Sequence, residues 1–138
     1  KQNKYKLVIA GDADHPSAYS ENLKRQALEE HVILTGFIKG EKLNEIMSNA
    51  ALFILPSFHE GLGLVLMEAD IQGVPVVATD ILGPRGFLKE HNGKLVSNDT
   101  EGIIQGMRDC LAGKVNVMNV DYIAYNQHVV DQFESILV

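Results

Sequence analysis

The sequence has 138 residues, of which 46% are hydrophobic and 22% are charged, and its formal net charge is −6. The length suits one domain and the composition is that of an ordinary globular protein, while the negative charge argues against nucleic acid or an anionic membrane surface as the main partner. The single cysteine, Cys110, excludes an internal disulfide and favours a reducing compartment. No apolar run approaches the length of a transmembrane helix, so we expect a cytoplasmic protein.

Five short apolar runs predict β-strands at residues 6–11, 32–37, 51–56, 74–79 and 93–97. Most of these runs are continuous in valine, isoleucine and leucine, which is typical of strands covered on both faces in a parallel sheet. The segments 17–30, 40–50, 98–113 and 122–138 have the composition and spacing of helices. We therefore predict an α/β fold over residues 1–138, with a Rossmann-like, doubly wound parallel sheet between two helical layers.

Glycines and polar residues follow four of the predicted strands, at residues 11–16, 36–40, 56–63 and 79–84. In open α/β sheets, ligands bind beyond the carboxyl ends of the strands. We therefore expect a polar crevice along this rim of the sheet.

The segment 57–80, SFHEGLGLVLMEADIQGVPVVATD, places Glu60 and Glu68 around a glycine-bearing turn. A helix that starts near Gly63 or Leu64 presents unpaired N–H groups and a positive dipole end, which suit a phosphate. Carboxylates accept hydrogen bonds strongly, so sugar hydroxyls are the better partners for the two glutamates. A nucleotide-sugar satisfies both requirements. The same spacing also fits simple turn glycines, a solvated Glu68 and a Glu60 beside the helix dipole.

The stretch HEGLGLVLMEADIQGVPVVATD closely resembles the signature of retaining glycosyltransferases of group 1 (family 4), which have the GT-B fold. The matching positions are Glu60, Gly61, Leu62, Gly63, Leu64, Glu68, Gly73, Pro75, Val76, Ala78 and Thr79. The flanking segments KLVIAGDAD, VILTGFIKGEKLNEIMSNAALFILPS and NGKLVSND are similar to the same family. The resemblance covers roughly residues 6–112 and implies a C-terminal domain that binds a nucleotide-sugar.

The resemblance implies a role for each matching site residue. Glu60 would contact the transferred sugar at the catalytic centre, and Glu68 would hold the ribose hydroxyls. The backbone would contribute in two places: the run Gly61, Leu62, Gly63 and Leu64 would meet the sugar and the phosphate, and Phe37 and Ile38 would flank the base. Transfer would retain the anomeric configuration, with no metal and no cofactor.

The resemblance also implies parts that this sequence does not contain: the N-terminal acceptor domain, and an earlier strand and loop that carry an arginine and a lysine. This chain alone is therefore expected to be inactive. The implied partners of the whole enzyme are the donor and an acceptor glycan or lipid-linked glycan, in polysaccharide or glycoconjugate synthesis at the inner membrane surface. A departure from the family pattern is Asp70, whose side chain we expect to face the surface.

Two other functions stay open on the sequence: a non-catalytic nucleotide-binding or interaction domain of Rossmann type, and a nucleotide-sugar epimerase of related fold.

Four further sets of residues give only weak evidence of a functional role. Asp12, Asp14 and His15 favour a polar rim loop over a metal site. Arg85, with Lys89, favours a surface or interdomain role over donor contact. His59 fits either donor contact or an exposed loop, and Cys110 fits a small core residue.

Overall fold

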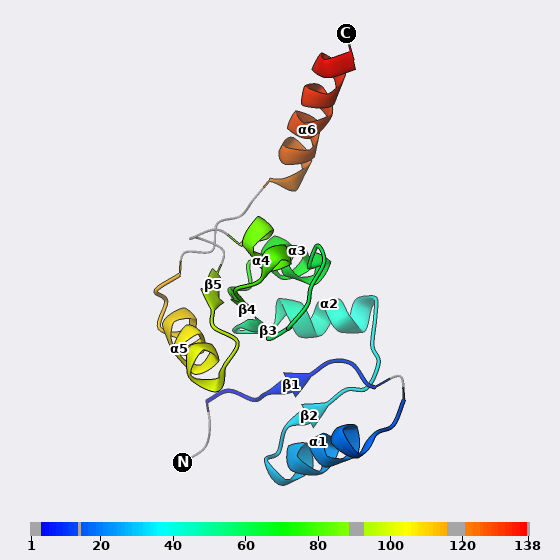
Figure 1. Ribbon diagram of the computed structural model, residues 1–138, viewed down its shortest axis with the longest axis vertical. Coiled ribbons are helices and arrows are strands. Elements are labelled where there is room, and N and C mark those ends of the chain that lie inside the picture. Colours follow the sequence, from blue (N-terminus) through cyan, green and yellow to red (C-terminus); the bar gives the residue numbers. More distant parts are fainter. Residues whose placement is uncertain (1–3, 14, 89–92, 116–120, 138) are drawn as a thin grey trace. The chain divides into compact units, whose positions relative to one another are not determined.

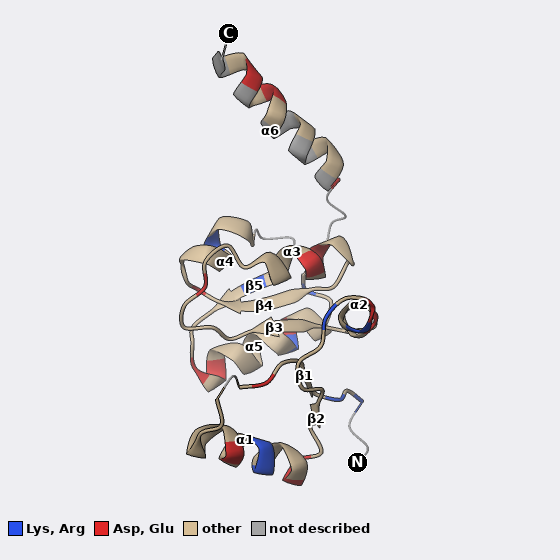
Figure 2. Ribbon diagram, turned by 90° about the vertical axis from the view of Figure 1, so that its right-hand side faces the viewer, with Lys and Arg blue, Asp and Glu red and all other residues tan. Residues whose placement is uncertain are grey.

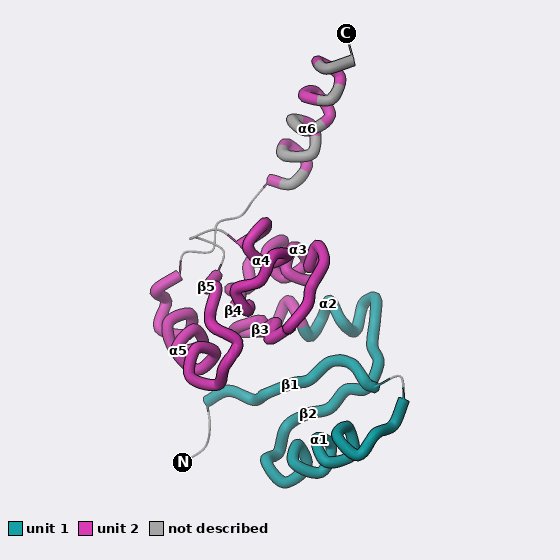
Figure 3. The backbone as a smooth tube through the Cα atoms, viewed as in Figure 1, with its two compact units in different colours: residues 1–46 teal, residues 47–138 magenta. Residues whose placement is uncertain are grey.

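The computed structural model describes residues 4–13, 15–88, 93–115 and 121–137. In chain order the elements are β1 (Val8–Ile9), α1 (Ala18–Glu29), β2 (Ile33–Leu34), α2 (Glu41–Ser48), β3 (Phe53–Leu55), α3 (Leu64–Ile71), β4 (Val76–Thr79), α4 (Leu82–Phe87), β5 (Gly93–Val96), α5 (Thr100–Leu111) and α6 (Tyr122–Leu137) (Figure 1). The chain divides into two compact units, Lys1–Ile46 and Met47–Val138, which are described separately below (Figure 3). Every strand lies inside an apolar run that predicted it.

The first unit pairs β1 with β2 in parallel, with Val8 opposite Ile33 and Ile9 opposite Leu34. Helix α1 begins with a capping box, in which the backbone N–H of Ser20 donates to Ser17 Oγ at 3.1 Å and the N–H of Ser17 donates to Ser20 Oγ at 2.9 Å. These two bonds satisfy N–H groups that the first turn of a helix leaves without partners. The helix buries only Ala27 fully.

The second unit contains a parallel sheet with the strand order β3-β4-β5. Phe53, Ile54 and Leu55 lie opposite Val76, Val77 and Ala78, and β5 runs in register along the other side of β4. Figure 2 shows α3 and α4 on one face of this sheet and α5 on the other face. This arrangement confirms the predicted parallel α/β fold with helical layers on both sides.

The core of the second unit lies on both faces of β4, whose four residues are all buried. Val76 and Ala78 pack in one cluster with Leu66 and Ala69 of α3, and Val77 packs in another with Cys110, Val115 and the partly buried Leu52 and Val96. This alternation follows from the two-residue period of a strand. Cys110 is therefore a core residue, as predicted, and burial raises the pKa of its thiol.

Two features differ from the sequence-based predictions. Asp70 does not face the surface, because its side chain is only 1% exposed. It lies on the buried stripe of α3 with Leu66 and Ala69, which are spaced as i, i+3 and i+4. The prediction was wrong because an aspartate is almost never fully buried unless it has a partner, so its residue type favoured solvent.

The second difference is α4, which was not predicted because its sequence, LGPRGF, contains two glycines and a proline. Pro84 is compatible with this helix because it falls in the first turn, where its missing N–H costs no intrahelical bond. Among the described residues we find no helix whose length and hydropathy together would allow it to cross a membrane.

Candidate functional site

The loop between β3 and α3 ends at Gly63, which is the N-cap of α3. Gly63 has a φ of 63° and a ψ of 47°, a left-handed conformation that favours glycine. A Cβ at this position would also lie 2.9 Å from Leu66 Cδ1. No side chain caps the helix, and the N–H of Leu66 donates to the Gly63 carbonyl at 2.8 Å. The positive dipole end and the N–H groups before Leu66 therefore suit an external acceptor.

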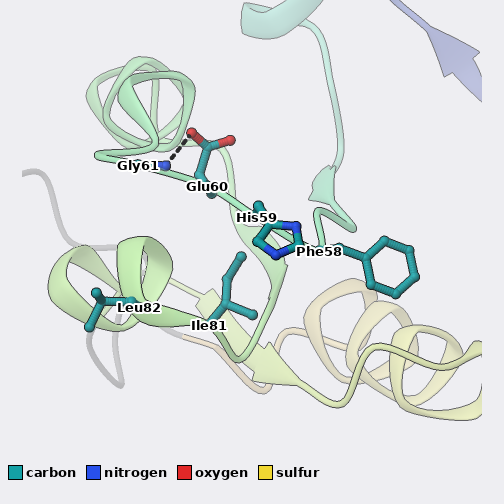
Figure 4. Close-up of a pocket in the computed structure, with 6 residues that line it drawn as sticks. All are labelled: Phe58, His59, Glu60, Gly61, Ile81 and Leu82. Carbon is teal, nitrogen blue, oxygen red and sulfur yellow. Dashed lines mark hydrogen bonds between the residues drawn. The ribbon is translucent and has the colours of Figure 1, made fainter.

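An open pocket of about 440 Å³ lies beside this loop, within the size range of ligand sites. Its lining residues are Phe58, His59, Glu60, Gly61, Ile81 and Leu82 (Figure 4). They come from the two segments that follow β3 and β4, and therefore from the carboxyl rim of the sheet. Ligands bind at this rim in open α/β folds, which is where the sequence predicted a crevice. The crevice was expected to be polar, whereas Phe58, Ile81 and Leu82 give half of the pocket's lining residues an apolar character.

Glu60 is partly buried in this pocket, and its Oε1 accepts a hydrogen bond from the backbone N–H of Gly61 at 3.0 Å (Figure 4). A carboxylate has about four lone-pair sites, so this one bond leaves capacity for hydroxyl donors from a ligand. The bond also orients the carboxylate along the loop. His59, for which the sequence allows either donor contact or an exposed loop, lines the same pocket and is exposed.

The structure does not bring Glu68 into the pocket, since Glu68 is exposed on α3 and does not line the cavity. It lies in the second turn of α3, as expected, whereas Glu60 precedes the helix. Leu62 and Leu64 are 79% and 63% exposed, so the surface of this loop is open to solvent rather than sealed in the core.

Phe37 and Ile38, the residues expected to flank the base, lie in the first unit just after β2. Phe37 is 79% exposed and Ile38 is partly buried. They follow Gly36, which has a φ of 66° and turns the chain after the strand. The expected donor residues are therefore divided between the two units.

Arg85 forms an ion pair with Asp80, with 2.5 Å between Arg85 Nε and Asp80 Oδ1, and both side chains are exposed. The hydrogen bond from Arg85 lowers the pKa of the Asp80 carboxyl, and the same bond raises the pKa of Arg85. The geometry agrees with a surface role for Arg85. Lys89 lies outside the described residues.

The aspartates near the end of β1 do not form a metal site in the part of the chain that the structure describes. Asp12 pairs with Lys24, with 3.2 Å between Lys24 Nζ and Asp12 Oδ1, and Asp14 lies outside the described residues. Within residues 4–13, 15–88, 93–115 and 121–137, no group of three histidine, cysteine or acidic side chains could hold a metal ion.

Sequence reasoning missed Ile81 and Leu82, two apolar residues that line the pocket from the segment after β4. The sequence did place both residues in the segment 79–84, which was expected to lie at the rim of the sheet. It did not mark them as site residues, because isoleucine and leucine side chains have no polar or reactive groups.

Comparisons with known proteins identify a family and several relatives that this chain resembles. The sequence model of the family described as "Glycosyl transferases group 1" matches residues 1–113. The chain is 33% identical over 103 residues to the 2-deoxystreptamine N-acetyl-D-glucosaminyltransferase of Niallia circulans, a match that covers 75% of this chain and 26% of that protein.

Two solved structures are similar to this chain over 78% of its length. The sucrose-phosphate synthase of Thermosynechococcus elongatus has 28% identity and a TM-score of 0.67, with 29% of that chain covered. The pneumococcal O-GlcNAc transferase GtfA, in complex with UDP and GlcNAc, has 26% identity and a TM-score of 0.54, with 21% covered. The chain thus spans about a quarter of the length of these relatives. Because the family match covers most of its residues, including the loop after β3 and all of α3, this chain belongs to the group 1 glycosyl transferases.

Proposed function

We propose that this chain is the donor-binding half of a retaining glycosyltransferase, which moves a sugar from a nucleotide-sugar to an acceptor. The observation that carries the proposal is the glycine-bearing loop at the carboxyl rim of β3. This loop presents Glu60 to an open pocket and leads directly into the uncapped start of α3. Membership of the group 1 family supports glycosyl transfer as the reaction.

In this proposal the donor diphosphate binds at the N-terminus of α3. The N–H groups there have no side-chain cap, and the helix dipole favours an anion. The backbone from Gly61 to Leu64 contacts the diphosphate and the sugar. Fixed N–H groups stabilise the negative charge that grows on the leaving group, so no metal ion is required.

The two glutamates bind hydroxyl groups on either side of that diphosphate. Glu60 accepts hydrogen bonds from the transferred sugar, since its carboxylate is already oriented by Gly61. Glu68, which is exposed on the second turn of α3, accepts hydrogen bonds from the ribose. Phe37 and Ile38 flank the base in the complete donor site.

The relatives support a nucleotide-sugar as the donor. The structure of the pneumococcal transferase contains UDP and GlcNAc, and the Niallia circulans relative is named for transfer of N-acetyl-D-glucosamine. We propose an acceptor of the glycan or lipid-linked glycan class, in polysaccharide or glycoconjugate synthesis. We further propose that the complete enzyme works in the cytoplasm, at the inner membrane surface.

We also propose that residues 1–138 form a C-terminal domain, which an N-terminal acceptor domain and one further strand complete. The support for further segments is that this chain spans only 26% of the Niallia circulans relative and 29% of the sucrose-phosphate synthase. The pocket is also open, so a second domain that closes over it would exclude water from the reaction.

Calorimetric titration of UDP-, GDP- and ADP-sugars tests the proposal. The 138-residue chain should bind one of these donors weakly and should transfer no sugar.

Replacing Glu68 by Ala should weaken donor binding about tenfold to a hundredfold, because it removes charge-assisted hydrogen bonds. Glu101→Ala is the matched control, since Glu101 is an exposed glutamate on α5 of the same unit. Equal affinities for the Glu68 and Glu101 variants would contradict the ribose role.

The role of Glu60 is tested in the complete enzyme with Glu60→Gln. This change keeps the size of the side chain and its capacity to accept a bond from Gly61, but removes the charge. The variant should fold normally and transfer sugar far more slowly than the unmodified enzyme. If the variant transfers sugar at the rate of the unmodified enzyme, Glu60 is not part of the catalytic site. Nucleotide binding without any transfer by the unmodified enzyme would instead favour the non-catalytic alternative.

A further inference from the structure

The loop that carries Glu60 has no regular secondary structure, so its shape depends on what holds it from outside. Residues 56–63 lie between β3 and α3 and include two glycines. Two contacts hold this loop: one comes from the last residue of β4 and the other from the first turn of α4. All of the residues involved belong to the second unit.

The first contact is made by Thr79, the last residue of β4, which is fully buried. Its Oγ1 donates a hydrogen bond to the backbone carbonyl of Ser57 at 2.5 Å. Asn98 Nδ2 approaches the same carbonyl at 3.5 Å. A buried hydroxyl needs a partner, so this bond ties the beginning of the loop to the central strand of the sheet.

The second contact is made by Gly83 in the first turn of α4. A Cβ built on Gly83 would lie 2.1 Å from the carbonyl oxygen of Gly61 and 2.8 Å from that of Glu60. Both distances are too short for any real contact, and both partners are backbone atoms that cannot rotate away. Gly83 does not have a positive φ, so its backbone conformation would accept other residues. Glycine is required here because there is no room for a side chain.

We propose that Thr79 and Gly83 are positioning residues that set the place of Glu60 and Gly61 in the pocket. Each contacts backbone atoms of the loop, so its expected effect on a donor acts through Glu60 and Gly61. The effect on donor binding rests on the proposed function, whereas the effect on loop placement does not. An alanine at Gly83 would move the Gly61 carbonyl by on the order of 1 Å, and a displacement of that size can change a rate about a hundredfold.

The test compares Gly83→Ala with Gly86→Ala in the same protein. Gly86 lies on the same helix, and a Cβ there would meet nothing within 4 Å. Two quantities are measured: the amide NMR chemical shifts of residues 57–63 without ligand, and the affinity for whichever of the UDP-, GDP- and ADP-sugars binds the unmodified protein most tightly. Gly83→Ala should shift the amides of Glu60 and Gly61 and weaken binding at least tenfold. Gly86→Ala should change neither, and identical results for the two variants would overturn the proposal.

A second pair of variants keeps the proposal testable if Gly83→Ala does not fold. Thr79→Val keeps the shape of the side chain but removes the donor hydroxyl, whereas Thr79→Ser keeps the hydroxyl. Thr79→Val should shift the amides near Ser57 and weaken donor binding, and Thr79→Ser should restore both. Equal behaviour of the two variants would contradict the positioning role of Thr79.

The two readouts separate failure of this inference from failure of the proposed function. If the unmodified protein binds no nucleotide-sugar, the proposed function fails, but the amide shifts still decide whether Gly83 and Thr79 place the loop. If the unmodified protein binds a donor and the Gly83 and Thr79 variants bind it equally well, the positioning inference fails while the donor site stands.

Discussion

The two units of the chain bury their apolar residues to very different extents. In the second unit, all four residues of β4 are buried and Leu66 of α3 is 0% exposed. In the first unit, Ile33 and Leu34 of β2 are 43% and 39% exposed, and α1 leaves Leu28 78% exposed. The strands of both units lie in runs of sequence that are rich in apolar residues. Apolar sequence therefore marks where a strand forms, but the layers packed on each side decide how deeply it is buried.

This difference bears on the candidate site, because the pocket belongs to the unit with the deeper core. The loop that carries Glu60 is tied to β4 through Thr79, and β4 has helices packed on both of its faces. A binding loop held by a rigid strand keeps its geometry better than a loop without such support. We infer that the core of the second unit holds the loop of the candidate site in a fixed position.

The comparison is tested most severely by Leu66→Ala in the second unit. This change leaves a cavity between α3 and the sheet and should lower the free energy of unfolding by about 2–5 kcal/mol. Urea unfolding, followed through amide signals of the second unit, measures the loss. Ile71→Ala on the same helix is the control, because Ile71 is 61% exposed. A similar loss in both variants would show that burial does not distinguish these positions.

The matching change in the first unit, Leu34→Ala, should have a smaller effect. Leu34 keeps more than a third of its surface in solvent, so its removal should cost about 1 kcal/mol. The same urea experiment, followed through amide signals of β1 and β2, measures this value. A loss as large as that of Leu66→Ala would mean that the first unit has a closed core in solution.

The smallest expected effect comes from the ion pair between Asp80 and Arg85, because exposed pairs are weak and are screened by water. The pKa of Asp80 is lowered in the folded protein, so its contribution is present above the unfolded pKa of about 3.9 and is lost as the pH falls through the folded pKa. Asp80→Asn should therefore lower the melting temperature slightly at pH 7. The two melting curves should converge in acid, and a difference that grows as the pH falls would contradict this assignment.

Much of the site could be predicted because its signals are local. The glycines at 61 and 63, the helix start near Leu64 and the place of Glu60 before that helix all follow from short-range sequence. The structure agrees with each of them, since α3 begins at Leu64 with Gly63 in a left-handed conformation. The donor contacts of Glu60, Glu68, Phe37 and Ile38 remain predictions.

The sequence by itself determined the order of the strands and of every helix except α4, because apolar spacing and helix caps act between residues only a few positions apart. Only the tertiary structure decided that Asp70 is buried, that LGPRGF forms α4, and that Thr79 and Gly83 support the loop after β3. The support of the loop joins residues that are 22 positions apart along the chain, as in the bond from Thr79 to Ser57. Close approach between distant segments is a property of packing, and no local pattern in the sequence encodes it.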